Sequence, residues 1–331
     1  MNWFERVTGF AELDYETTQS LLRVEGEHLV SAHSQRRWGI GRFETPTLAQ
    51  LRVLVGATSL GEGRRTRFRA ITGDAQKLHC DPANALALFQ VASQFNALEM
   101  VAPSVTPEQG VSRYASDPTQ GPACAIAAGA ATIWRNYLVP LAGGVGQRED
   151  RQIDTLCELG SAFGNHDGEL WEMRNGYALC TANGLDVIDR RLAEEDGEGR
   201  ERLLGLLRIG LHWDVEVTVA QSPLTVSQAF CSALPCSYSP IPKPRWERFA
   251  RLVLDAAYQA TLHAAVLNFH RTGCPIVYLT RLGGGAFGNA DAWIFDAIQS
   301  ALLRHAESGL DVRLVSFGRV PKEYEVLEAH G

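Results

Sequence analysis

A cluster of polar side chains follows an apolar run of the chain. Gln94, Asn96 and Glu99 come directly after residues 85–91, which are nearly all apolar. The two amides offer donors and acceptors suited to sugar hydroxyls. The carboxylate could transfer a proton or stabilise a positive charge. Side chains of these types also cap helices and tie down turns, so a structural role is the alternative.

A second acidic segment lies in a long stretch of weak periodicity, residues 92–122. Asp117 precedes a proline, a position that holds the backbone extended. Such a long stretch is uncommon in a compact domain without a functional reason. We therefore interpret Asp117 as a carboxylate aimed at a substrate, with a turn-forming aspartate as the alternative. The backbone of Thr119, Gln120 and Gly121, just before a predicted helix, could form an edge that faces an anion.

A third segment, rich in glycine, separates a predicted strand, residues 276–279, from a predicted helix, residues 291–305. Four glycines in six residues let the backbone approach a ligand closely and adopt positive φ without strain. Their N–H groups, together with the first turn of the helix, suit a phosphate or diphosphate. A mobile surface loop is the alternative. The glycine loop comprises Gly283, Gly284, Gly285, Ala286, Phe287, Gly288 and Asn289.

The glycine spacing also matches Gly-x-Gly-x-x-Gly, the fingerprint of nicotinamide and flavin dinucleotide sites. That fingerprint normally opens a sheet which continues through several strands, with an acidic residue after the next strand. Here the next predicted strand, residues 312–317, is followed by Gly318 and Arg319, and little chain remains. We therefore assign the loop to the last βαβ unit and keep a nicotinamide-dependent oxidoreductase as an alternative.

Strands and helices alternate around these segments, which predicts an α/β protein with a mixed, largely parallel sheet. The run at residues 85–91 is apolar enough to be buried on both faces. The predicted strands are residues 66–72, 85–91, 176–181, 215–219, 226–231, 276–279 and 312–317. The predicted helices are residues 122–137, 185–207 with an interruption at 196–199, 245–270 and 291–305.

The composition is that of an ordinary globular protein, with 331 residues, 45% apolar and 21% charged. A net charge of −7 without a basic tract argues against direct nucleic-acid binding.

The seven cysteines form no C-x-x-C pair and no His-x-x-x-His pair occurs, so we expect neither disulfides nor a metal site. No apolar run approaches the ~20 residues that cross a bilayer, and a secretory signal is lacking. We expect a cytoplasmic protein without membrane contact.

Taken together, these segments resemble the macrodomain superfamily of ADP-ribose-binding and ADP-ribosylhydrolase proteins. The likeness lies in Gln94-Phe95-Asn96-Ala97-Leu98-Glu99 after a buried strand and in the glycine loop before the last helix, with residues 117–122 between them. It is strongest to the larger, diverged branch that includes poly(ADP-ribose) glycohydrolase-like proteins of bacterial effectors and phages. The resemblance covers roughly residues 65–320.

The resemblance implies a three-layer α/β/α macrodomain-like domain over residues 66–331. An N-terminal extension, residues 1–65, is expected to pack on that domain, with a turn at residues 61–63. The chain departs from the family in two respects. Its first loop lacks the usual glycine triplet, and the consecutive glutamates of poly(ADP-ribose) glycohydrolases are absent.

The resemblance also implies ADP-ribose as the ligand. Asn96 would contact the distal ribose, Phe287 would lie against a ribose, and the loop glycines would wrap the diphosphate. The residues expected to bind the ligand are Gln94, Asn96, Thr119, Gln120, Gly121, Gly283, Gly284, Gly285, Ala286, Phe287, Gly288 and Asn289.

We therefore expect an ADP-ribosylhydrolase that acts on an ADP-ribosylated protein without a cofactor. The bond at C1 of the distal ribose would break through an oxocarbenium-like state, which a carboxylate can stabilise or whose attacking water it can activate. Asp117 is the first candidate for this carboxylate and Glu99 the second. A non-catalytic ADP-ribose reader, which needs neither carboxylate, is the alternative. An effector-like protein would act after delivery into a host cell.

Overall fold

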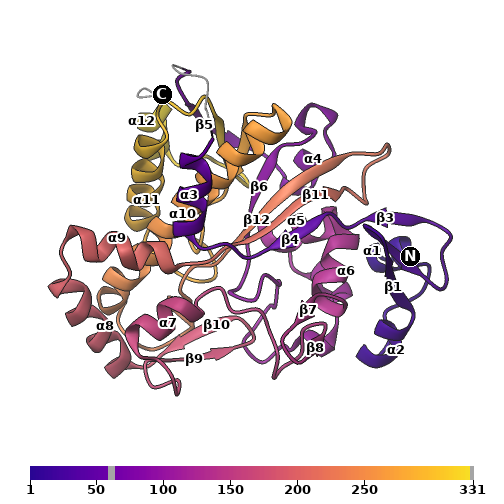
Figure 1. Cartoon of the computed structure of the whole chain (residues 1–331), viewed down its shortest axis with the longest axis horizontal. Helices are drawn as coiled ribbons and strands as arrows, with labels where there is room; N and C mark the ends of the chain where they lie inside the picture. Colours follow the sequence, from indigo (N-terminus) through magenta and orange to yellow (C-terminus); the bar gives the residue numbers. More distant parts are fainter. Residues whose placement is uncertain (59–63, 329–331) are drawn as a thin grey trace.

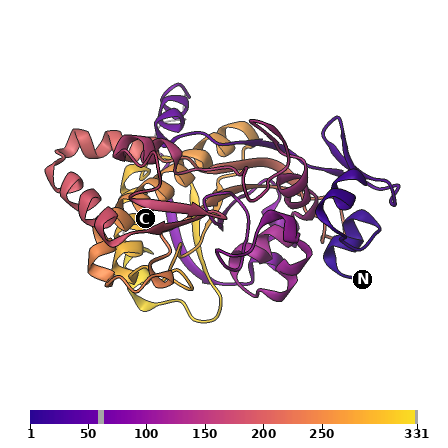
Figure 2. The same ribbon diagram turned by 90° about the horizontal axis from the view of Figure 1, so that it is seen from below.

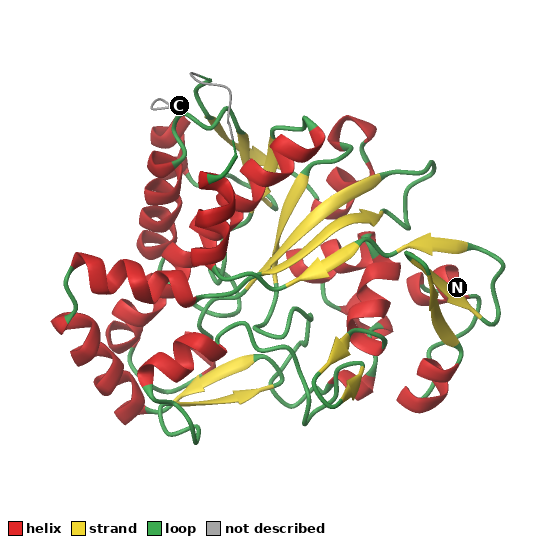
Figure 3. Cartoon of the chain, in the orientation of Figure 1, coloured by secondary structure: helices red, strands yellow, loops and turns green. Residues whose placement is uncertain are grey.

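The computed structural model describes residues 1–58 and 64–328, and a mixed sheet of seven strands forms its centre (Figures 1 and 3). In spatial order the strands are β4 (Arg42–Glu44), β11 (Gly210–Glu216), β12 (Thr225–Cys231), β6 (Leu88–Ala92), β13 (Ile276–Leu279), β14 (Asp311–Ser316) and β5 (Arg67–Thr72). Neighbours from β12 to β5 are parallel, whereas β11 is antiparallel to both β12 and β4. The predicted α/β class with a largely parallel sheet is confirmed.

Helices form a layer on each face of the sheet. In the described residues the helices are α1 (Trp3–Thr8), α2 (Tyr15–Ser20), α3 (Leu48–Gly56), α4 (Ala75–Cys80), α5 (Gln120–Ala127), α6 (Gly129–Tyr137), α7 (Cys157–Phe163), α8 (Ala182–Glu194), α9 (Gly197–Leu206), α10 (Glu247–Thr272), α11 (Asp291–Arg304) and α12 (Glu325–Glu328). The long α10 packs on one face with α3 and α11, while α4, α5 and α6 cover the other. In the described part of the chain, no helix is both long and apolar enough to span a bilayer.

The central strand β6 is buried on both faces, as its apolar run predicted. Leu88 packs into the core that contains α10, and its neighbour Phe89 packs into the core on the opposite face. Successive side chains of a strand point to opposite faces, so each face of β6 supplies one of the two cores. This burial fixes the end of β6. The polar residues Gln94, Asn96 and Glu99 follow that end in the chain.

The helix predicted over residues 122–137 is two helices, α5 and α6, with a break at Ala128. Ala128 has φ −104° and ψ 55°, outside the helical region. The N–H of Gly129 donates to Oγ1 of Thr218, at 3.0 Å, rather than to a carbonyl of the preceding turn. The contact partner lies far away in the sequence, so the run of small residues alone could not indicate the break.

Residues 1–39 of the N-terminal extension form a small unit at one end of the molecule (Figures 1 and 2). Strands β1 (Leu22–Glu25), β2 (His28–Ser31) and β3 (Arg37–Gly39) make an antiparallel sheet beside α1 and α2. Their apolar side chains share a core with α6. The chain then enters the large sheet as the edge strand β4. The turn predicted at residues 61–63 lies outside the described residues.

The long stretch between β6 and α5 contains two short 3₁₀ helices, η2 (Pro107–Gln109) and η3 (Ser112–Ser116). The strand predicted at residues 176–181 is β10 (Tyr177–Cys180), which pairs with β9 (Trp171–Arg174) in a hairpin outside the seven-stranded sheet. A second small hairpin joins β7 (Pro140–Leu141) to β8 (Gly144–Val145). The stretch between β6 and α5, together with Tyr177 of β10, lies at the edge of the sheet where β6, β12 and β13 end.

Candidate functional site

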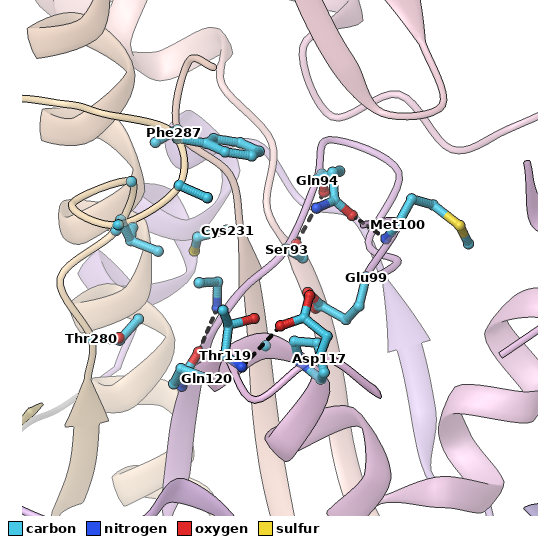
Figure 4. A pocket seen from close by; sticks show the side chains of 18 of the residues that line it. Ser93, Gln94, Glu99, Met100, Asp117, Thr119, Gln120, Cys231, Thr280 and Phe287 are labelled. Carbon is cyan, nitrogen blue, oxygen red and sulfur yellow. Dashed lines mark hydrogen bonds between the residues drawn. The ribbon is translucent and has the colours of Figure 1, made fainter. Parts of the chain in front are cut away.

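Loops that leave three neighbouring strands, β6, β12 and β13, meet around a cavity of about 350 Å³ (Figure 4). In open α/β sheets, ligands bind outside the carboxyl ends of the strands. The volume lies within the ~300–1,000 Å³ of small-molecule sites. Ten predicted site residues line this cavity: Gln94, Glu99, Asp117, Thr119, Gln120, Gly121, Gly283, Gly285, Ala286 and Phe287.

The structure does not bring every predicted ligand residue into the cavity. Those outside its lining are Asn96, Gly284, Gly288 and Asn289. Asn96 is fully buried, where its Oδ1 accepts the N–H of Leu98 at 3.0 Å and its Nδ2 donates to Oε1 of Gln152 at 2.8 Å. The ribose contact predicted for Asn96 therefore finds no support, because its amide is already engaged in holding the turn.

A tight turn at the end of β6 fixes the position of Glu99. The N–H of Gln94 donates to the carbonyl of Leu98 at 3.1 Å, and the side-chain oxygen of Gln94 accepts the N–H of Met100 at 2.6 Å. The N–H of Glu99 itself donates to the buried hydroxyl of Tyr114 at 3.0 Å. The backbone on each side of Glu99 is thus held, and its side chain is directed to the cavity (Figure 4).

The carboxyl group of Glu99 lies in an unusual environment for an acid. The residue is 4% exposed, and its Oε1 has no hydrogen-bond partner among the residues that the structure describes. A Cβ added to Gly121 would lie 2.1 Å from Oε2, so only glycine leaves room for this carboxyl. Burial raises the pKa of Glu99 well above its usual range; the charge of Arg135 opposes this shift and that of Asp117 adds to it. Burial therefore favours the protonated acid.

The buried cation beside this acid is Arg135, on α6. Its Nε donates to the carbonyl of Ala97 at 3.1 Å, and one terminal nitrogen donates to Oγ1 of Thr132 at 3.2 Å. The guanidinium carbon lies 3.9 Å from the centre of the Phe230 ring. Burial lowers the pKa of Arg135 to about 10. Because these contacts tie Arg135 to the turn that carries Glu99, we assign it to holding the turn.

Asp117 supplies the second carboxylate of the cavity. It follows η3 directly and is half-buried. One oxygen, Oδ1, accepts the N–H of Thr119 at 2.9 Å, an Asx-type bond that orients the side chain. The Asp117 and Glu99 carboxyl groups point toward one another in Figure 4. A buried acid and a more exposed carboxylate thus face the same space.

The glycine loop contributes backbone donors to the opposite wall. Within the described part of the chain, the N–H groups of Gly283, Gly285, Ala286 and Phe287 make no hydrogen bond, and all four residues line the cavity. Adjacent unpaired N–H groups in a concave wall form an anion-binding nest. The predicted phosphate-binding character of the loop is therefore matched by its free donors.

Backbone conformation and the contacts of Asn289 hold the loop in shape. Gly283 and Gly288 have φ of 70° and 71°, a conformation that glycine adopts without strain. The N–H of Asn289 donates to the carbonyl of Gly283 at 2.9 Å, and its side-chain Nδ2 donates to the carbonyl of Leu234 at 2.8 Å. Gly288 and Asn289 thus brace the loop, in place of the ligand contacts predicted for them.

The first turn of α5 adds a second group of donors. Thr119 caps this helix without a side-chain hydrogen bond, and the N–H groups of Gln120 and Gly121 have no partner in the described residues. The side chain of Gln120 instead accepts the N–H of Ala92 at 2.9 Å and donates to the carbonyl of Gln90 at 2.8 Å. Gln120 therefore fastens α5 to β6 through its side chain and offers only its backbone to a ligand.

An aromatic wall closes one side of the cavity. The rings of Tyr177, Tyr238 and Phe287 have centroids 5.1 to 5.6 Å apart and all line the cavity. Of these three rings, only Phe287 was predicted from the sequence to line the site. Tyr177 belongs to the β9–β10 hairpin and Tyr238 to the loop after β12. Neither tyrosine carries a local signal of its position. Flat rings of this kind suit a nucleobase or a sugar face.

Arg281 is the basic residue that lines the cavity, and it was not among the predicted site residues. It lies two positions before the glycine loop and forms an ion pair with Asp291 at the start of α11. Its Nε is buried without a hydrogen-bond partner in the described part of the protein. Its position two residues before a glycine loop of phosphate-binding type is the signal that could have identified it.

The burial of Glu99 predicts a specific dependence of stability on pH. The pKa of Glu99 is higher in the folded protein than in the unfolded chain, where it is about 4.3. The stabilisation by its bound proton is therefore complete below that pH and is lost as the pH rises through the folded-state pKa. We expect the free energy of unfolding of wild type, minus that of Glu99→Gln, to fall as pH rises from about 4. Denaturant unfolding from pH 4 to 9 measures this difference, and a flat difference would contradict the burial of an ionisable group.

The structure is thus an α/β protein with a cavity at the carboxyl ends of parallel strands, lined by backbone N–H groups that have no hydrogen-bond partner in the described residues. No protein-family model matches the chain, and no curated protein matches its sequence. Several solved structures resemble the fold. One is poly(ADP-ribose) glycohydrolase from Thermomonospora curvata, at 12% identity and a TM-score of 0.47, covering 91% of this chain and 89% of that one.

Two further structures show a similar degree of likeness. The Deinococcus radiodurans poly(ADP-ribose) glycohydrolase in complex with ADP-ribose is 11% identical with a TM-score of 0.44, over 87% of this chain and 92% of that one. The Thermomonospora curvata enzyme bound to the inhibitor ADP-HPD is 12% identical with a TM-score of 0.44, over 95% and 94%. Since these TM-scores lie below 0.5, the functional assignment depends on the geometry of the cavity.

Proposed function

We propose that the protein binds ADP-ribose in this cavity and hydrolyses the glycosidic bond that joins the distal ribose to a modified protein. One observation carries the proposal. A single cavity combines unpaired backbone N–H groups, an aromatic wall, and two carboxyl groups that face each other. A diphosphate, a flat base and a reacting sugar need those three features together.

The backbone donors suit the diphosphate of such a ligand. The N–H groups of Gly285, Ala286 and Phe287 on one wall, and those of Gln120 and Gly121 on another, have no other partner in the described residues. Binding the diphosphate there would hold the distal ribose at the carboxyl groups. Positioning of this kind accounts for much of the rate in glycosyl hydrolysis, because the reacting atoms are then held in reach of one another.

The two carboxyl groups can divide the chemistry between them. Glu99, favoured in its protonated form by burial, would donate its proton to the atom that leaves C1 as the bond breaks. Asp117 would stabilise the positive charge that develops at C1 and accept a proton from the attacking water. The products are the modified residue with its proton restored and ADP-ribose with a hydroxyl at C1. This refines the sequence-based ranking, since each acid receives its own role.

A non-catalytic reader is the second candidate, and one contact favours it. Oδ1 of Asp117 accepts the N–H of Thr119, a bond that capping aspartates commonly make. If that were the whole role of Asp117, the cavity would bind ADP-ribose but lack a group to activate water. The reader uses the same N–H groups and the same aromatic wall.

Two measurements separate hydrolase from reader. Calorimetry with ADP-ribose reports binding, and incubation with a mono-ADP-ribosylated protein, followed by chromatography of free ADP-ribose, reports turnover. We expect binding and turnover together. Binding without turnover would establish the reader, and the absence of both would reject ADP-ribose as the ligand of this cavity.

The aromatic wall predicts how affinity depends on a single ring. Tyr238 is 38% exposed and lies 5.6 Å, centroid to centroid, from Phe287. We expect Tyr238→Ala to weaken ADP-ribose binding by about 5- to 150-fold, because stacking on one ring contributes ~1–3 kcal/mol. Tyr238→Phe keeps the ring and should bind within about threefold of wild type, given that stacking needs no hydroxyl. Equal losses in both variants, measured by calorimetry, would argue against stacking.

A further inference from the structure

The N-terminal extension contacts the loop that carries Asp117 through two residues, the half-buried Glu12 and the buried Trp3. Glu12 lies between α1 and α2, and its two carboxylate oxygens accept the N–H groups of Val111 and Ser112 at 2.8 and 2.7 Å. Oε1 also accepts the hydroxyl of Tyr137 at 2.8 Å. A carboxylate on two successive amides at the start of a short helix satisfies donors that the helix leaves unpaired.

The loop is shaped to receive this side chain. Gly110 has φ 80°, and a Cβ added there would lie 2.4 Å from Oε2 of Glu12. On the same side, the indole Nε1 of Trp3 donates to the carbonyl of Ser112 at 3.2 Å. Trp3 is buried in the core that it shares with Tyr114. Two residues of the extension therefore hold the first turn of η3.

The other parts of η3 reach the two carboxyl groups of the cavity. Its buried Tyr114 accepts the N–H of Glu99 with its hydroxyl, at 3.0 Å. The N–H of Asp117 donates to the carbonyl of Tyr114 at 3.1 Å. Asp117 therefore directly follows η3 and is hydrogen-bonded to it. Four residues, 113–116, thus separate the contact with Glu12 from Asp117.

We propose that Glu12 is a positioning residue, through which the N-terminal extension sets the geometry of the Glu99 and Asp117 carboxyl pair. This inference rests on the proposed function for its effect on rate. Glu12 is absent from the cavity lining and does not touch the ligand site. Its loss should therefore change the chemical step more than the binding of ADP-ribose.

Glu12→Gln tests this role, because it keeps the size of the side chain but replaces one acceptor oxygen with a donor. We expect kcat for release of ADP-ribose to fall by about 10- to 100-fold, because a small displacement of the reacting groups lowers the rate by this much. We expect Kd for ADP-ribose to stay within about twofold, since the groups assigned to binding are untouched. The matched control is Glu16→Gln in the same extension, where Glu16 pairs with Arg148 at the surface; it should leave kcat unchanged. Equal losses of kcat and affinity, or an unchanged kcat, would overturn the proposal.

Amide hydrogen exchange tests the role of Glu12 independently of the proposed function, because it reports on the loop and not on turnover. Glu12→Gln keeps one acceptor oxygen and replaces the other with an NH₂ group, so the N–H of either Val111 or Ser112 loses its acceptor and must exchange faster. The proposal predicts faster exchange also at Glu99 and Asp117, which bond to Tyr114. Faster exchange at Val111 or Ser112 alone would overturn it, even if the wild-type protein hydrolyses nothing and the proposed function fails. Should Glu12→Gln not fold, Trp3→Phe removes the indole bond to the carbonyl of Ser112 together with part of a buried ring, and exchange at Glu99 and Asp117 is then the readout.

Discussion

Glu99→Gln is expected to lower kcat for release of ADP-ribose by about 10²- to 10⁴-fold, the usual contribution of a general acid. The glutamine has almost the same shape, so it fits beside Gly121, but it cannot donate the proton that the leaving atom needs. Affinity for ADP-ribose should change by less than about threefold, because the backbone N–H groups that we assign to the diphosphate are unaltered. Single-turnover kinetics and calorimetry measure the two effects separately.

Asp117→Asn is the partner variant for this experiment. It keeps an oxygen for the N–H of Thr119, so the capping contact at 2.9 Å can persist. Removing the charge should still lower kcat, since the developing positive charge at C1 loses its counter-charge. Full activity in both variants would remove the two acids from the mechanism. A loss of kcat in Glu99→Gln alone would assign the chemistry to Glu99 and leave Asp117 as a cap.

Gly121→Ala is expected to have the second large effect. An added Cβ would lie 2.1 Å from the carbonyl oxygen of Ala92 and 2.1 Å from Oε2 of Glu99. Either the end of β6 or the Glu99 carboxyl must then move. We expect kcat to fall by about 100-fold or more, because a displacement of ~1 Å costs about that much. Overpacking should also lower the free energy of unfolding by about 1–3 kcal/mol.

The control for this variant is a glycine with free space around it. Gly197 opens α9, and nothing lies within 4 Å of a Cβ added there. Gly197→Ala should therefore leave kcat and the free energy of unfolding close to those of wild type. If Gly121→Ala retained wild-type activity, as measured by the same turnover assay, the tight contact between α5 and Glu99 would not matter for catalysis.

Local patterns were sufficient to predict the parts of the site that form within one segment. The apolar run of β6 and the glycine run after β13 are each contiguous, and their burial and free N–H groups follow from local composition. The parallel pairing of β13 with β14 also agrees with the predicted last βαβ unit. Such features depend on neighbouring residues in the sequence, so a single segment is enough to predict them.

The remaining features depend on contacts between distant segments. Asparagine is a residue type that commonly binds sugars. The side-chain Nδ2 of Asn96, however, donates to Oε1 of Gln152, 56 positions later in the sequence. Tyr177 and Tyr238 reach the cavity from separate elements, and nothing near them in sequence indicates an aromatic wall. The contact of Glu12 with the loop before Asp117 spans about 100 residues. Residue type indicates what a side chain can do, whereas only the packing decides which partner it meets.

The most direct test is a crystal structure of the protein with ADP-ribose. The proposed function predicts that diphosphate oxygens lie within about 3 Å of backbone nitrogens of the glycine loop, among them Gly285, Ala286 and Phe287. It also predicts that C1 of the distal ribose lies between the carboxyl groups of Glu99 and Asp117. A ligand bound elsewhere on the molecule, or a diphosphate that makes no contact with these nitrogens, would contradict it.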